Sequence, residues 1–223
     1  MGFVSNVPSR LDTLRMRGCS ARMENEAVKA ITNFIRQRRS IKPVDMDTAR
    51  GVDRAVLDAL FENANWAPTH GLTEPWRFHV FQGNARQQLA DEMRRLYQAQ
   101  TPVAEFRADK MRKLGENPLL APVVIAIVMQ RNGGAKICEL EEIEATACAV
   151  QNMHLTASAH GLAAYWSTPP LVYSPEFAQW LSIGKEDRCL GLFYIGWPKP
   201  GLQWPEGIRK PVAQKIVWRG EDE

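Results

Sequence analysis

The chain has 223 residues, 45% of them hydrophobic and 24% charged, which is the composition of a globular protein long enough to bury one substantial core. Its 28 Lys and Arg residues nearly balance 25 Asp and Glu residues, and the basic residues are scattered along the chain. This pattern argues against a nucleic-acid-binding surface. No apolar run approaches the roughly 18 residues that a membrane span needs, so we expect no membrane partner.

The four cysteines contain no Cys-x-x-Cys pair, and none of the four histidines lies at a spacing that suggests a pair of metal ligands. Neither a disulfide framework nor a metal site is indicated. A reducing compartment fits this cysteine usage, so we expect a cytoplasmic protein.

Residues 1–22 carry four arginines against the single acid Asp12, which is typical of a transit peptide but also of an upstream extension or a misassigned start. Met23 opens "MENEAVKAITNFIRQRRS", which is a sensible beginning for a helix. We therefore expect an N-terminal extension over residues 1–22 and one domain over residues 23–223.

Apolar periodicity predicts an alternation of helices and strands along the domain. The expected helices cover residues 23–38, 47–66, 85–100, 104–115, 139–162 and 174–181. The expected strands cover residues 76–83, 121–130, 163–170 and 189–198, followed by an extended tail. Because the strand "APVVIAIVMQ" is apolar throughout, both of its faces should be covered. The fold class is therefore α+β, or a three-layer domain, with a mixed sheet.

Familiar catalytic motifs are missing from the sequence. No strand is followed by Gly-x-Gly-x-x-Gly, and "RNGGAK" does not match a phosphate loop. Neither His-Glu-x-x-His nor Gly-x-Ser-x-Gly occurs. Candidate functional residues are therefore sought at the ends of the predicted elements.

Arg38, Arg39 and Ser40 end the first predicted helix with two guanidinium forks and a hydroxyl, which suit phosphate or polyol oxygens. The alternative is that the arginines complement the negative pole of the helix C-terminus. Arg209, in the tail sequence "GIRKP", is either a third contact to an anion or an ordinary surface arginine.

Trp166, Ser167 and Thr168 follow a predicted strand and precede two prolines. An aromatic face with neighbouring hydroxyls suits a flat aromatic ligand, although core packing followed by a turn explains the same residues. The loop "NWAPTHGLTEPWRFHVF", residues 65–81, likewise places Trp66 and His70 between two prolines.

Taken in order, these segments resemble the nitroreductase family, and in particular its compact members. The motifs are "RRSIKPV", "APTHGLTEPWRF", the long small-residue helix, "LAAYWST", "LGLFYIGWPKP" and "RKPVAQKIVW". The resemblance covers about residues 24–218. It implies a three-layer α/β/α fold with a mainly antiparallel sheet, and a homodimer that builds its flavin mononucleotide (FMN) sites between two subunits.

The resemblance also implies roles for individual residues. Arg38, Arg39 and Ser40 match the segment that holds the FMN phosphate and ribityl chain, and Arg209 matches a tail arginine at the phosphate. Trp66 and His70 match loop positions beside the flavin. Three further residues match a strand end that flanks the flavin ring from the partner subunit: Trp166, Ser167 and Thr168.

Two loop residues depart from the common family form. Leu72 replaces an Asn that would bond the pyrimidine edge of the flavin, and Glu74 replaces a Gln. A carboxylate near the ring would disfavour negative charge on the reduced flavin, so the departure bears on its reduction potential.

The implied function is that of an FMN-dependent oxidoreductase that uses NADH or NADPH and reduces nitroaromatic, quinone or enone-like acceptors. Hydride would pass in ping-pong fashion through FMN N5, so no protein acid or base is required, and His70 is a possible proton donor. Two alternatives stay open: a flavin-binding or sensing module without turnover, and a dehalogenating or flavin-fragmenting relative on the same fold.

Overall fold

The computed structural model describes residues 21–133 and 136–220. By its internal contacts the chain divides into two units, residues 1–36 and 37–223, which are considered separately. The expected extension over residues 1–22 lies almost entirely outside the described residues, so its boundary stays a prediction.

Helix α1 (Ala21–Gln37) confirms the first predicted helix. Its apolar residues recur at helical spacing, yet each of those in the last three turns is more than half exposed: Val28, Ile31, Phe34 and Ile35. The helix is therefore amphipathic, as its periodicity predicts.

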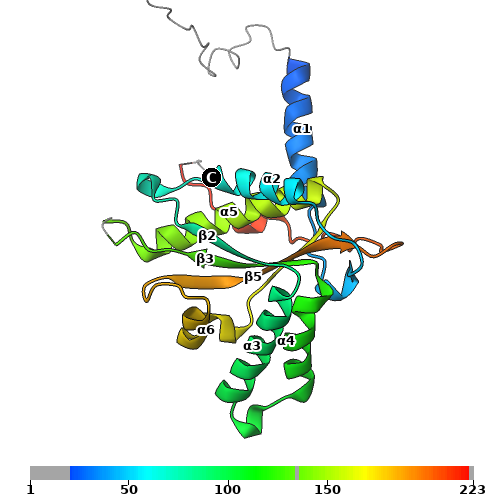
Figure 1. Cartoon of the computed structure of the whole chain (residues 1–223). Coiled ribbons are helices and arrows are strands. Elements are labelled where there is room, and N and C mark those ends of the chain that lie inside the picture. The colour runs from blue at the N-terminus through cyan, green and yellow to red at the C-terminus, as the bar shows by residue number, and fades with distance from the viewer. Residues whose placement is uncertain (1–20, 134–135, 221–223) are drawn as a thin grey trace, which may run out of the picture. The chain divides into compact units, whose positions relative to one another are not determined.

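The second unit contains a five-stranded sheet (Figure 1). Its order is β1-β5-β3-β2, and β4 also pairs with β5. The strands are β1 (Met46–Asp47), β2 (Trp76–Phe81), β3 (Val123–Met129), β4 (Ala163–Ser167) and β5 (Arg188–Pro198). All four pairings among the described strands are antiparallel, so the expected mixed, mainly antiparallel sheet is antiparallel throughout this part of the chain.

Strand β3 lies at the centre of the core, and every one of its residues is buried. Because side chains alternate along a strand, Val123, Ile125 and Ile127 join one hydrophobic cluster while Val124 and Ala126 join another. The continuous apolar run that predicted a strand covered on both faces is thereby confirmed.

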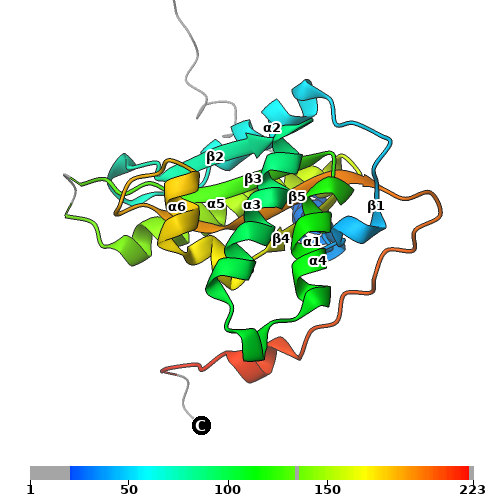
Figure 2. The same ribbon diagram turned by 60° about the horizontal axis from the view of Figure 1, so that its bottom comes forward.

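Helices cover both faces of this sheet (Figures 1 and 2). Leu57 and Leu60 of α2 (Arg54–Asn65) pack with Met153 of α5 (Glu139–Ala159) on one face. The opposite cluster contains side chains of α3 (Ala85–Gln100), α4 (Ala108–Leu120) and α6 (Pro175–Trp180). The α+β, three-layer α/β/α architecture is confirmed.

Helix α2 begins at Arg54, so the predicted start at residue 47 is wrong. Residues 46–47 form β1 instead, and the Asp47 carboxylate accepts a hydrogen bond from the Ala49 N–H, a local turn that competes with helix. Gly51 then separates this turn from the helix. No helix in the described part of the chain is both long and apolar enough to span a membrane.

Candidate functional site

Arg38 and Arg39 lie on the segment that leaves α1 and runs beside strand β4. The Ile41 N–H donates to the Ala164 carbonyl at 2.9 Å, which fixes this segment against the sheet. From α5, His154 Nε2 lies 3.0 Å from the Arg39 carbonyl oxygen and 3.4 Å from Arg38 Nη1. Three elements distant in sequence therefore meet at the two arginines.

Arg209 of the tail lies near enough for its charge to act on Arg38, and we call Arg38, Arg39 and Arg209 the arginine cluster. Burial lowers the pKa of Arg38, and the charges of Arg209 and Arg39 lower it further. Among the described residues, neither Arg38 nor Arg209 forms an ion pair with a carboxylate. The like charges of Arg38 and Arg209, which have no carboxylate partner among the described residues, suit an anion such as a phosphate.

His154 of helix α5 contacts the backbone of the arginine cluster. The ring is 6% exposed and packs edge-on against Phe193, and burial together with the Arg38 charge lowers its pKa to about 4. The ring is therefore neutral near pH 7, with its Nε2 proton donated to the Arg39 carbonyl. No local sequence signal indicates this role, because the two residues lie 115 positions apart.

A pocket of about 510 Å³ lies directly beside the arginine cluster. It is lined by Gln37, Arg39, Ser158, Trp204, Pro205 and Glu206. Ser40, the third residue of the predicted phosphate segment, is exposed next to Arg39. The cluster is thus accessible from solvent, as a ligand site must be.

Trp66 lies at the end of α2, and His70 lies in the loop that follows it. The Trp66 ring is 71% exposed and its N–H donates to Glu62, while His70 Nδ1 lies 3.3 Å from Glu141 Oε2 near the start of α5. From Glu141 to His154 the helix rises about 20 Å. The structure therefore places the His70 ring apart from the arginine cluster, and whether both meet one ligand stays a prediction.

The loop that holds His70 is strained at the two residues that depart from the common family form. Leu72 and Glu74 adopt left-handed backbone angles, with φ of 54° and 44°, which cost about 1–2 kcal/mol each for residues other than glycine. Leu72 is 82% exposed, so burial of its side chain does not offset this cost. Strain of this kind concentrates at functional sites.

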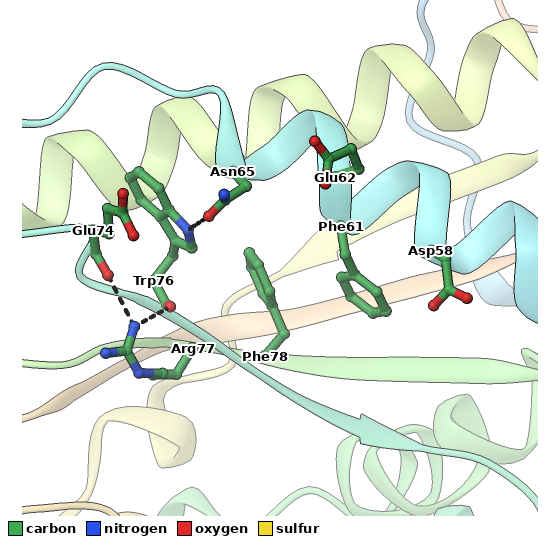
Figure 3. A pocket seen from close by; sticks show the side chains of 8 residues that line it. All are labelled: Asp58, Phe61, Glu62, Asn65, Glu74, Trp76, Arg77 and Phe78. Carbon is green, nitrogen blue, oxygen red and sulfur yellow. Dashed lines mark hydrogen bonds between the residues drawn. The ribbon is translucent and has the colours of Figure 1, made fainter. Parts of the chain in front are cut away.

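A second pocket, of about 360 Å³, lies between α2 and β2 (Figure 3). The rings of Phe61 and Phe78 stack with their centroids 5.5 Å apart. The carboxylates that line this pocket belong to Asp58, Glu62 and Glu74. Its charge is opposite to that of the arginine cluster, so it does not suit an anion.

Trp166, Ser167 and Thr168 end strand β4 beside Gly191 of β5. The Trp166 N–H donates to the Leu190 carbonyl at 3.0 Å, so this polar group already has a partner. Gly191 has φ +129°, and a Cβ there would lie 2.6 Å from Trp166 Nε1 and 2.7 Å from the Ser167 carbonyl oxygen. Glycine is required because the two strands approach closely. Thr168 is exposed and Ser167 is half-buried.

Among the described residues, no three His, Cys, Asp or Glu side chains are grouped so that they could hold a metal ion. The polar features of the site are therefore the arginine cluster, the strained loop and the end of β4.

Comparisons with known proteins agree with this fold. The model of the nitroreductase family matches residues 35–197. YdjA of Escherichia coli K12, which carries the name of an NAD(P)H nitroreductase, is 28% identical over 60% of this chain and 70% of its own. Human iodotyrosine deiodinase 1 is 25% identical over 87% of this chain and 71% of its own.

Solved structures resemble the chain over most of its length. A nitroreductase-like family protein from Bacillus cereus is 29% identical with a TM-score of 0.73, covering 86% of this chain and 96% of its own. The FMN-dependent nitroreductase NfnB from Mycobacterium smegmatis, solved in complex with NADPH, has the same fold at 18% identity and a TM-score of 0.67, covering 86% and 99%. The family model spans most of the chain and the fold agrees with it: the chain belongs to the nitroreductase family.

Proposed function

We propose that the chain is an FMN-dependent oxidoreductase that takes its electrons from NADH or NADPH. The observation that carries the proposal is the arginine cluster, in which Arg38 and Arg209 lie close together without a carboxylate partner among the described residues. Family membership and the FMN-dependent NfnB with its bound NADPH support this choice of cofactor and donor.

The residues present fit a phosphate-bearing cofactor. Arg38 and Arg209 would bind the phosphate, which would relieve the repulsion that lowers the Arg38 pKa. Ser40 would donate to the ribityl chain. When bound, FMN supplies reversible hydride-transfer chemistry between a nicotinamide and an acceptor.

Other residues would shield and orient the ring. Trp66 and His70 would form one wall, and Trp166, Ser167 and Thr168 of the second subunit in a homodimer would form the other. Because a carboxylate only accepts, His70 would donate its Nδ1 proton to Glu141, and its Nε2 would carry a second, transferable proton only in the imidazolium form. The acceptors would be nitroaromatic, quinone or enone-like compounds, and the location cytoplasmic.

The exposed tail supports a homodimer. Ile208 is 79% exposed, Val217 77% and Trp218 71%, although all three are large apolar side chains. Val217 and Trp218 are neighbours in the chain, and adjoining exposed apolar groups mark contact surfaces more often than isolated ones do.

A second candidate is reductive dehalogenation of a halogenated aromatic compound. The observation that favours it is the similarity to iodotyrosine deiodinase over 87% of this chain. Fold and cofactor are shared by both activities, so the acceptor alone separates them.

The test is an absorbance spectrum of the purified protein incubated with FMN, followed by anaerobic titration with NADH or NADPH. We expect bound flavin that is bleached by the nicotinamide and restored by a nitroaromatic or quinone acceptor. Restoration only by a halogenated phenol would favour the second candidate. Bound flavin restored by oxygen alone would indicate a binding module, and no bound FMN at micromolar concentration would refute the proposal.

A further inference from the structure

We infer that Arg39 is a latch for the C-terminal tail that places Arg209 beside Arg38, and not itself a ligand of the phosphate. The inference rests on the proposed function for the identity of the anion. Arg38 and Arg39 then have different roles, although the sequence predicts the same role for both.

The guanidinium of Arg39 is committed to protein groups. Its Nε donates to the Pro205 carbonyl at 2.7 Å, and its Nη1 donates to the Arg38 carbonyl at 2.9 Å. One side chain thus bonds the phosphate segment and the tail, which lie 166 positions apart in sequence. Arginine suits this bridge because its donors have a fixed fork geometry.

The tail is shaped to receive this side chain at Gly207. A Cβ on Gly207 would lie 2.5 Å from Arg39 Nη2 and 2.7 Å from its Cζ, distances that real Cβ atoms do not adopt. The planar guanidinium therefore lies directly against the tail backbone, two residues before Arg209.

The tail needs such an attachment. Within its own subunit, the tail over residues 203–220 is exposed throughout, so contacts inside the single chain bury little of its apolar surface. The bonds of Gln214 to Pro211 and of Lys215 to Lys210 are local and do not fix the tail to the sheet. The Arg39 to Pro205 bond does connect the tail to the segment beside β4.

The Arg39 backbone is itself fixed. His154 donates to its carbonyl at 3.0 Å, so the latch is anchored on helix α5. Arg38, by contrast, keeps a half-buried guanidinium whose contact with His154 is long, at 3.4 Å. Arg38 and Arg209 therefore remain available to an anion, while Arg39 positions one relative to the other.

A double-mutant cycle on FMN affinity tests the inference, with dissociation constants measured by quenching of flavin fluorescence. Arg39→Gln should raise the dissociation constant about tenfold in the wild type and not at all in an Arg209→Ala background, because the latch acts through Arg209. Penalties that simply add would identify Arg39 as an independent ligand and overturn the inference.

Gly207→Ala is the charge-preserving variant. It keeps all three arginines but displaces the Arg39 guanidinium, so a latch predicts a several-fold weaker affinity for FMN. Unchanged affinity in this variant would contradict the latch. Arg219→Gln, which removes an exposed arginine further along the tail, is the control and should leave affinity unchanged.

A second readout needs no flavin. Limited trypsin digestion of the FMN-free protein, followed by mass spectrometry, reports how often the tail detaches. Cleavage after Arg209 should be several-fold faster in Arg39→Gln than in wild type or Arg219→Gln, and equal rates would refute the latch; Pro211 blocks cleavage after Lys210. If the wild type bound no FMN, the proposed function would fail, while this readout would still decide the inference.

Discussion

The two regions of α5 that contact proposed site residues differ in charge, burial and strain. Near the end of the helix, buried neutral His154 supports the arginine cluster. Near its start, exposed His70 faces Glu141, on a loop strained at Leu72 and Glu74. The first region concentrates positive charge on a fixed backbone, while the second combines acids with a strained one. Positive charge suits a phosphate, so we propose the first region for the phosphate of FMN and the loop for its ring.

The largest expected effect is at the arginine cluster. Arg38→Ala should weaken FMN binding about 10- to 100-fold, because hydrogen bonds to a charged group contribute about 1.5–3 kcal/mol. Fluorescence titration measures the change. Arg112→Ala, on helix α4 and in a weak surface pair, is the control. If Arg38→Ala and the wild type bound FMN equally well, the FMN phosphate would not lie at the arginine cluster.

His154 should make stability depend on pH. Its pKa in the folded chain is about 4, below its ordinary value, so the unfolded chain binds a proton between about pH 6.5 and 4 while the folded chain does not. This contribution to stability is complete above pH 6.5 and is lost as the pH falls. We expect a loss of about 2 kcal/mol between pH 7.5 and 5.

Urea denaturation of wild type and His154→Gln at both pH values measures this contribution. The variant should be less stable at pH 7.5, but its stability should change less on acidification, by about the same 2 kcal/mol. His160→Gln, at the exposed end of the same helix, controls for loss of an imidazole. Parallel pH profiles for His154→Gln and wild type would show that the ring is not held neutral by its surroundings.

The comparison also indicates what sequence alone can predict. The sequence predicts strand β3 from its unbroken apolar run and helix α5 from its long stretch of small and apolar residues. Both are local patterns. The predicted start of α2 is wrong, because the turn at Asp47 overrides the apolar pattern. Arg38 and Arg209 were singled out by the resemblance, but the support from His154 depends on contacts across 115 positions, which no local pattern records.

A smaller effect is expected at the strained loop. Leu72→Gly should raise the free energy of unfolding by about 1 kcal/mol, because glycine adopts a positive φ without steric cost and the leucine side chain is mostly exposed. Leu140→Gly is the matched control, since Leu140 is also exposed but lies in helix α5, where glycine costs about 1 kcal/mol. Destabilisation by Leu72→Gly would mean that the leucine makes compensating contacts.

The smallest effect on folding is expected at His70. Its pair with Glu141 is exposed on both sides and spans 3.3 Å, and such surface pairs contribute little to stability. His70→Gln should therefore leave the melting temperature unchanged. If His70 donates a proton during turnover, the same variant should slow reduction of the acceptor while leaving reduction by the nicotinamide intact, which stopped-flow measurement of the two half-reactions resolves. Equal rates in both half-reactions would restrict His70 to the wall of the site, and a change in FMN affinity would instead mean that the loop and the arginine cluster hold one ligand together.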